Sequence, residues 1–249
     1  NVAAGSVGAG FITDGDYCNE TFNWTDNFAH SARDGVLVYD DPAKAYVNWP
    51  TWYGGVCRIV GGVTTYNNGD SGMTLYYVNG NVTVTNFGSV GNMMGLVPLL
   101  YDPRTDTGDN ELNFTIKDSF FAGHWNNESC IAATFKCRMT EFDNRFWCER
   151  FQDATPKIGN MGLVEAVFLS SMYTTRTLGE EKYMFIEPDS YHAVKGKAYV
   201  QNVHFDNFDG DTSCGHKSVA FYQHPFSNDT FHLHTFVNIT WGPGMRTGG

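Results

Sequence analysis

Two consecutive stretches of the chain repeat one another at a constant interval. The repeat covers residues 58–76 and residues 81–99. Gly95 follows Gly72 at the same interval at which Val82 follows Ile59. A period in the low twenties, with short strands and turns inside each repeat, is what one coil of a parallel β-helix requires. The repeat therefore predicts strands that stack coil on coil, about 4.8 Å apart.

Other segments have the same character of a short apolar strand closed by a polar turn. Gly35-Val36-Leu37-Val38-Tyr39 follows Gly10-Phe11-Ile12-Thr13 at a similar interval. Related pieces follow at residues 114–120, 200–208 and 236–240. Loops are predicted between them, the largest at residues 40–55, 102–110 and 123–159. No segment keeps helical spacing of apolar residues for three turns, although an antiparallel sandwich would also give short strands.

The predicted fold is therefore all-β, a right-handed parallel β-helix with loop insertions and disulfide bonds. With 249 residues and 42% hydrophobic content, the chain can bury one sizeable core. We expect a single β-helix domain over residues 1–241, and a linker or frayed end over the glycine-rich residues 242–249. We also expect the chain to be a piece of a longer polypeptide.

Charge and hydropathy exclude two classes of partner. The formal net charge of −11 would repel a phosphate backbone, and the 16 Lys and Arg are scattered, so nucleic acid is not an expected partner. The longest apolar stretches, Met93–Tyr101 and Met161–Met172, are shorter than the roughly 18–20 residues that span a bilayer. We expect no membrane span in this segment.

Acceptor sequences for N-linked glycans are more frequent than random placement of Asn, Ser and Thr would give. They stand at Asn19, Asn23, Asn81, Asn113, Asn127, Asn228 and Asn238. Each is an N-x-Ser/Thr sequence, which marks the surface of a secreted protein when it is modified. We therefore predict N-linked glycans at several of these sites and passage through a secretory pathway.

The cysteines form an even set without metal-binding spacing. They are Cys18, Cys57, Cys130, Cys137, Cys148 and Cys214. No pair has the C-x-x-C spacing of zinc ribbons or thioredoxin-like sites, so disulfides are predicted rather than a metal. Six thiols allow fifteen connectivities, between which the sequence does not choose. Free buried cysteines in a cytosolic protein are the alternative.

The first forty residues carry a family resemblance. The opening residues 1–6 with Gly10-Phe11, then residues 26–31 and 34–39, resemble the parallel β-helix region of fibrocystin and fibrocystin-like proteins. That region is shared with the cell-migration-inducing hyaluronan-binding protein and the related transmembrane hyaluronidase. The likeness continues through residues 57–59, 81–84 and 116–119, and resumes over residues 162–241.

The resemblance implies a large ectodomain with other modules upstream and a single membrane anchor downstream. It implies placement on the surface of the cell, including that of cilia or flagella, and no established catalytic activity. Neighbouring domains of the same chain, other extracellular proteins and glycans are the partners it implies, within a larger assembly.

One motif could carry acid–base chemistry. Asn27-Phe28-Ala29-His30 could place an imidazole beside Asp34 in a groove, where the histidine would act as general acid or base. Recurring Asn and His residues in a β-helix more often form hydrogen bonds to a turn within the stack, as buried polar groups must.

A pair of neighbouring carboxylates is what a glycoside hydrolase or a polysaccharide lyase could use for catalysis. The pairs are Asp14 with Asp16, Asp40 with Asp41, and Asp106 with Asp109. Asp14 and Asp16 are the best geometric candidates, because residues two apart on a strand face the same way. Acidic loop residues are otherwise simply solvated.

Two further patterns could bind metals. His232 and His234 would share one strand face, where zinc or copper would need a third ligand such as His216 or His224. Residues 206–211, Asp-Asn-Phe-Asp-Gly-Asp, offer oxygen ligands that calcium would accept, although a turn between coils explains them as well. No metal and no cofactor is predicted, and calcium is the alternative.

The prediction for function is an extracellular architectural or adhesive module that presents loops and glycans along a rigid rod. The alternative is a carbohydrate-active protein that binds or cleaves an acidic polysaccharide such as hyaluronan. A groove for a polyanion should gather arginines and lysines. Here the arginines are spread among acidic neighbours, at Arg58, Arg104, Arg138, Arg145 and Arg150, which favours the first interpretation.

Overall fold

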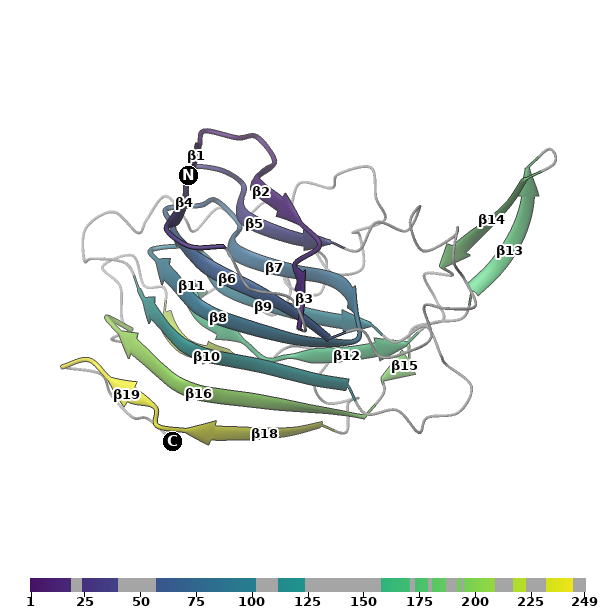
Figure 1. Cartoon of the computed structure of the whole chain (residues 1–249). Coiled ribbons are helices and arrows are strands. Elements are labelled where there is room, and N and C mark those ends of the chain that lie inside the picture. Colours follow the sequence, from purple (N-terminus) through teal and green to yellow (C-terminus); the bar gives the residue numbers. More distant parts are fainter. Residues whose placement is uncertain are drawn as a thin grey trace.

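The computed structural model describes residues 1–18, 24–39, 57–101, 112–123, 158–170, 173–178, 181–186, 192–193, 195–208, 217–222 and 232–243. Within these ranges every regular element is a β-strand, as the sequence predicted. The large loops predicted at residues 40–55, 102–110 and 123–159 lie almost wholly outside the described residues. The strands form two largely parallel sheets and a hairpin (Figure 1).

The larger parallel sheet, sheet A, contains strands that lie far apart in the sequence. Its order is β1 (Val2–Ala4), β4 (Asn27–His30), β6 (Cys57–Tyr66), β8 (Asn81–Val90), β10 (Leu112–Ala122), β16 (Gly196–Asp206) and β18 (His232–Val237). The short strand β19 (Thr240–Trp241) continues beside β16 after β18.

Sheet B is built from the segments between these strands. Its order runs through β2 (Ala9–Thr13), β5 (Asp34–Tyr39), β7 (Ser71–Asn79) and β9 (Met94–Tyr101), and then β11 (Ile158–Val164) and β12 (Val167–Ser170), which both pair with β9. β17 (Lys217–Tyr222) pairs with β11. Successive long strands thus alternate between the sheets, and the chain advances in one direction from β1 to β18 (Figure 1).

Three small elements are antiparallel and were not predicted. β3 (Asp16–Tyr17) pairs with the start of β6, and β15 (His192–Ala193) pairs with β12. β13 (Tyr173–Leu178) and β14 (Glu181–Ile186) form a hairpin that extends away from the two sheets in Figure 1.

The predicted period holds in sheet B and is wrong by one residue in sheet A. Met73 pairs with Leu96, so the two segments keep the predicted interval in sheet B. In sheet A, however, Ile59 pairs with Thr83, which lies one position beyond the predicted partner Val82. The reason is the turn that leads from sheet A to sheet B, which takes residues 67–70 in the first segment and only residues 91–93 in the second.

Two columns of left-handed residues mark where each coil bends. One crosses the middle of sheet A and contains Asp26, Gly62, Asn86, Asp118, Asn202 and Asn238, with φ between 50° and 59°. The other follows the ends of β1, β4, β6, β8 and β16 and contains Gly5, Ser31, Asn67, Gly91 and Asn207. Asparagine, aspartate and glycine are the residues that adopt this conformation most readily, which explains the polar turn residues of the repeat.

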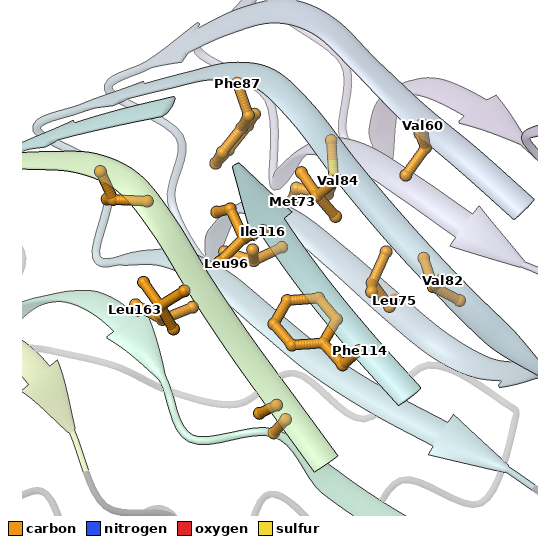
Figure 2. Packing of buried hydrophobic residues seen from close by; sticks show 14 of the residues in the cluster. Val60, Met73, Leu75, Val82, Val84, Phe87, Leu96, Phe114, Ile116 and Leu163 are labelled. Carbon is orange, nitrogen blue, oxygen red and sulfur yellow. The ribbon is translucent and has the colours of Figure 1, made fainter. Parts of the chain in front are cut away.

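Apolar side chains from both sheets fill the space between them. Val60, Val84 and Ile116 from sheet A lie one above another, each at most 2% exposed, and they face Met73, Leu96 and Leu163 of sheet B (Figure 2). An aromatic column continues the core, with Phe121 stacked on Phe205 at a centroid distance of 5.2 Å. Burial of such side chains stabilises the fold by about 1.5–3 kcal/mol each.

Two buried asparagines hold the turn between the sheets. The backbone and side-chain nitrogens of Asn68 both donate to Oδ1 of Asn92 at 2.9 Å. Nδ2 of Asn92 in turn donates to the backbone oxygen and the hydroxyl of Thr65. Polar groups that are buried without partners cost about 1–3 kcal/mol each, so this mutual satisfaction fixes the register of the two coils.

A column of glycines lets the coils of sheet B approach each other. Its members are Gly10, Gly35, Gly72, Gly95 and Gly162. A Cβ atom built on each would lie 2.4–2.9 Å from the carbonyl oxygen of the next residue in the column. The column ends at Ala220, which can carry a Cβ because its strand, β17, is the last described strand on that side.

The glycine column yields a stability test. In Gly95→Ala, the new Cβ would lie 2.4 Å from the oxygen of Gly162 and 2.7 Å from Cδ1 of Phe121. We expect the free energy of unfolding to fall by about 1–3 kcal/mol, because backbone and a packed ring must both move. Urea denaturation of the purified protein measures this change.

The matched control is Gly69→Ala, where the nearest atom to the new Cβ is 3.8 Å away. That change should stay within about 0.5 kcal/mol of the unsubstituted protein. Equal effects of the two substitutions would contradict the packing argument.

Candidate interaction surfaces

Asn27 and His30 of the predicted acid–base motif both make structural contacts. Asn27 is buried and accepts from Nδ2 of Asn1 at 2.9 Å, while its own Nδ2 donates to the oxygen of Gly62. The ring of His30 stacks on Tyr66 at 4.5 Å, and its Nδ1 lies 3.1 Å from the Ser31 hydroxyl. Both side chains therefore stabilise the stacking of neighbouring coils and the turn that follows β4.

Asp34 lies in a different set of contacts. Its carboxylate accepts from Nε of Arg33 at 2.9 Å and from the hydroxyl of Ser71 at 2.7 Å. The same Nε is 3.6 Å from the carboxylate of Asp70. These contacts tie the turn before β5 to the turn before β7, so they secure neighbouring coils.

The first carboxylate pair borders a disulfide-bonded loop. Asp14 and Asp16 flank Gly15, and the backbone oxygen of Asp14 accepts from Nη1 of the buried Arg58 at 2.7 Å. The guanidinium of Arg58 also lies 5.5 Å from the centroid of the Tyr17 ring. The other two pairs, Asp40 with Asp41 and Asp106 with Asp109, lie outside the described residues.

Cys18 and Cys57 form a disulfide that closes this loop. It joins residues 39 positions apart and lies next to the antiparallel pairing of β3 with β6. The prediction of disulfide bonding is thus confirmed for this pair. Cys130, Cys137, Cys148 and Cys214 fall outside the part of the chain that the structure describes.

His234 has an aromatic environment at the last coil. Its Nδ1 is 3.7 Å from Oε1 of Glu165, and both side chains are largely buried. The rings of Phe221 and Phe236 lie 5.9 Å and 6.4 Å from the imidazole centroid. His232 shares the strand, whereas His216 and His224 lie outside the described residues. Over the described residues, no three metal-ligating side chains gather at one point.

Asp206 and Tyr222 also make contacts within the stack. Oδ1 of Asp206 accepts from the backbone nitrogen of Asn207 at 2.8 Å, so the carboxylate caps a turn; residues 209–211 of the calcium-like segment are outside the described ranges. Burial raises the pKa of the Tyr222 phenol above its usual value, and the backbone oxygen of this residue accepts from the nitrogen of Glu165.

The last coil presents core side chains to solvent. Phe236 occupies the position above Val200, Ile116 and Val84, which are at most 1% exposed, yet Phe236 is 47% exposed. Trp241 likewise stacks on Phe205 at 5.2 Å and is 45% exposed. No described strand pairs with the outer edge of β18 or β19. We call Phe236, Val237 and Trp241 the end patch.

The first coil has small side chains in two of the stacked columns. Ala3 stands in the same column as Trp241, since it pairs with Ala29 at the opposite end of that column. Beside it, Gly10 begins the glycine column. At these two positions the first coil thus carries Ala3 and Gly10, on strands β1 and β2 that have no described outer neighbour, whereas Phe11 of β2 packs against the core.

A separate group of aromatic side chains lies on the outer surface of sheet A. Phe28, Tyr66 and Phe120 are 36–44% exposed there, and the ring of Phe120 covers Gly88, where a Cβ would meet Cε1 at 2.5 Å. These residues lie on the side of the stack, on inner strands of sheet A and not on its outermost strands.

Three predicted glycan acceptors are described. Asn81 is the first residue of β8 and Asn113 is the second residue of β10; both lie on the outer face of sheet A and are half-buried, while Asn238 is exposed at the bend of the last coil. Nδ2 of Asn238 donates to Oδ1 of Asn202 at 3.1 Å. Asn19, Asn23, Asn127 and Asn228 lie outside the described residues.

Sequence reasoning missed the end patch, although a signal was available. Phe236 and Trp241 belong to the same repeated pattern as Val200 and Phe205, so their inward phase could be read from alignment of residues 236–241 with residues 200–205. The repeated pattern does not show which strand lies at the end of the sheet.

Among the described residues there is no helix long and apolar enough to cross a membrane.

Comparison with known proteins supports a distant relation to fibrocystin. Fibrocystin of Canis lupus familiaris is 25% identical over 217 residues, which are 84% of this chain and 5% of that protein. Fibrocystin-L of Homo sapiens is 24% identical over 246 residues, or 96% of this chain and 5% of that protein. Fibrocystin of Mus musculus is 24% identical over 212 residues, with coverage of 84% and 5%.

The chain therefore spans about one twentieth of the length of these relatives. No protein-family model matches the chain. No solved structure matches it either. The distant relation agrees with the resemblance of the opening residues.

The disulfide provides a stability prediction. Replacing Cys18 and Cys57 together by serine removes the bond across a separation of 39 residues. We expect the free energy of unfolding to fall by about 4 kcal/mol, because the unfolded chain regains the entropy of the open loop. Urea denaturation at fixed pH measures the loss; an unchanged midpoint would show that the bond does not constrain the chain.

Proposed function

We propose that this chain is a segment of a cell-surface glycoprotein and acts as a structural link in an extended rod. The proposed fold is a right-handed parallel β-helix over residues 1–241. Its sides present loops and glycans, and its end joins it to neighbouring polypeptide. Placement at the cell surface, including that of cilia or flagella, rests on the resemblance to fibrocystin-like ectodomains.

Three features support the β-helix. The strands alternate between two parallel sheets. Their side chains form columns from coil to coil, and left-handed residues recur at the same bends. Parallel strands that are joined through a crossover are connected in a right-handed sense in about 98% of cases, which favours a right-handed coil.

The observation that carries the proposed role is the end patch. Core columns continue into Phe236 and Trp241, where nearly half of each side chain meets solvent. An unpaired strand edge beside exposed apolar rings favours addition of a further strand. The occupant that fits is another β-coil with apolar inward residues, which a longer ectodomain would supply as a neighbouring segment.

Partner contact through the end patch is testable by sedimentation velocity of the purified chain. Without its neighbour, the patch should find another copy, so we expect association that strengthens with concentration. Phe236→Ser with Trp241→Ser should weaken that association at least tenfold, since about 1.4 kcal/mol of lost apolar contact corresponds to a factor of ten.

The control is Phe120→Ser, which removes a ring of similar exposure, 40%, from the side of the stack. Its association should match that of the unsubstituted chain. A chain that stays monomeric at high concentration, or equal effects of the two sets of substitutions, would contradict a role for the end patch. Circular dichroism checks that each variant retains its strands.

The alternative function is cleavage or binding of an acidic polysaccharide. Among the relevant residues that the structure describes, Asn27 and His30 make contacts within the stack, and Arg58 is buried against Tyr17. The formal net charge of −11 also opposes a polyanion. These observations favour the structural role.

We expect no turnover when the purified chain is incubated with labelled hyaluronan and the products are separated by size. The decisive variants are Asp14→Asn and His30→Ala. Cleavage by the unsubstituted protein that either substitution abolished would replace the structural role by an enzymatic one.

A further inference from the structure

A short ladder of side-chain hydrogen bonds runs along the bend of sheet A. Nδ2 of Asn202 donates to Oδ1 of Asp118 at 2.9 Å, and Nδ2 of Asn238 donates to Oδ1 of Asn202 at 3.1 Å. The three residues belong to successive coils, at β10, at β16 and directly after β18, and their φ values are 51°, 51° and 52°. We call Asp118, Asn202 and Asn238 the bend ladder.

The carboxylate of Asp118 fixes the direction of the bend ladder. A carboxylate only accepts hydrogen bonds, so Asn202 must turn its amide nitrogen toward Asp118. The amide oxygen of Asn202 then faces the next coil, where Asn238 has to present its own nitrogen. Each asparagine therefore donates to the preceding coil and offers its oxygen to the coil that follows.

The bend ladder ends on an acceptor. Asn238 has the same backbone conformation as Asn202, so its Oδ1 faces away from β16, toward the position of a further coil. Within the described part of the chain, no group donates to this oxygen, and no strand pairs with the edge of β18 on that side. A further strand with a donor at this position would extend the ladder.

The bend ladder has a fixed relation to the core columns. In β10 and β16, an inward apolar side chain lies two positions before the ladder residue, and an inward aromatic ring lies three positions after it. These inward residues are at most 1% exposed: Ile116, Phe121, Val200 and Phe205. Phe236 and Trp241 hold the same two positions around Asn238, and they are the exposed rings of the end patch. The open acceptor and the open apolar columns therefore lie along one unpaired edge.

We propose that the strand which covers the end patch carries an asparagine at its bend, with an apolar residue two positions before it and an aromatic residue three positions after it. The amide nitrogen of that asparagine donates to Oδ1 of Asn238, and the two flanking residues cover Phe236 and Trp241. This inference rests on the proposed function, in which a further coil joins the end of the stack, and it specifies the sequence of that coil.

Asparagine is the residue that meets both requirements of the bend position. Glycine, asparagine and aspartate adopt the left-handed conformation most readily. Glycine has no side-chain donor, and an ionised aspartate would place a second acceptor against the oxygen of Asn238. When a strand adds to a sheet edge, main-chain hydrogen bonds supply affinity and side chains supply specificity. The bend ladder would thus distinguish between strands that pair equally well through their backbones.

The test uses a fluorescent peptide that copies residues 196–206, because β16 already has the required pattern around Asn202. Fluorescence anisotropy measures its binding to the purified chain, at chain concentrations below those of self-association. All tested chains carry Thr240→Ala, which removes the glycan acceptor sequence at Asn238 and keeps the amide. We expect binding that Phe236→Ser with Trp241→Ser weakens at least tenfold, in line with about 1.4 kcal/mol of lost apolar contact.

Two matched substitutions isolate the ladder bond. A peptide with Asn202→Gly keeps the left-handed bend without the donor, and it should bind about threefold more weakly, as expected for the loss of one neutral hydrogen bond at an exposed position. In the chain, Asn238→Gly keeps the bend and removes the acceptor. On that chain the two peptides should bind equally, because neither can form the bond. A peptide with Asn202→Asp should bind the chain that retains Asn238 more weakly than the Asn202→Gly peptide does.

The outcomes separate this inference from the proposed function. If the peptides bind equally to the chain that retains Asn238, while binding still depends on Phe236 and Trp241, the bend ladder does not select the partner and the proposed link stands. A preference for the asparagine peptide that persists on the Asn238→Gly chain would also overturn the inference. Binding of no peptide, or binding that does not depend on Phe236 and Trp241, would overturn both the inference and the proposed link.

Discussion

The close approach of successive coils in sheet B is the constraint on which the rest of the structure depends. Each carbonyl oxygen in the glycine column occupies the space where the Cβ of the glycine below it would lie. That approach leaves room for Thr65 and Asn68 beside Gly35, and for Phe121 beside Gly95. Larger residues in the column would separate the coils and remove the contacts of the turn between the sheets.

Polar and apolar interactions contribute differently to the stability and the register of the coils. The apolar columns supply most of the stabilisation, but they would tolerate a shift of register between similar side chains. The asparagine pair Asn68 and Asn92 does not, because a displaced coil would leave buried amide groups without partners. Register is thus set at the turns and reinforced by the core.

Much of the fold could be predicted from the repeat. The period identified neighbouring strands in sheet B, and the related segments that contain Ile116, Val200 and Phe236 do pair in sheet A. The error of one residue at Ile59 arose because a turn can gain a residue without changing the strands on either side. A count along the sequence cannot separate turn residues from strand residues.

The contacts of the candidate residues were less predictable than the strands. The sequence placed His30 and Asp34 close together along the chain, but it could not show that their partners are Tyr66 and Ser71 on the next coil. The same holds for the disulfide, because Cys57 meets Cys18 only through the antiparallel pairing of β3 with β6. These contacts depend on the arrangement of whole strands.

The uneven spacing of the coils has a consequence for the order of folding. Between β10 and β16, the hydrogen-bonded pair Asp118 and Asn202 is separated by 84 positions, against 32 for Asn81 with Asn113 and 36 for Asn202 with Asn238. The free-energy cost of closing a loop grows by about 0.6 kcal/mol for each doubling of loop length. Joining β10 to β16 therefore costs about 1 kcal/mol more than joining the other pairs. Distant pairings also form slowly. We therefore expect β10 and β16 to meet last, as a seam between an early-forming block of coils that ends at β10 and a second block that starts at β16.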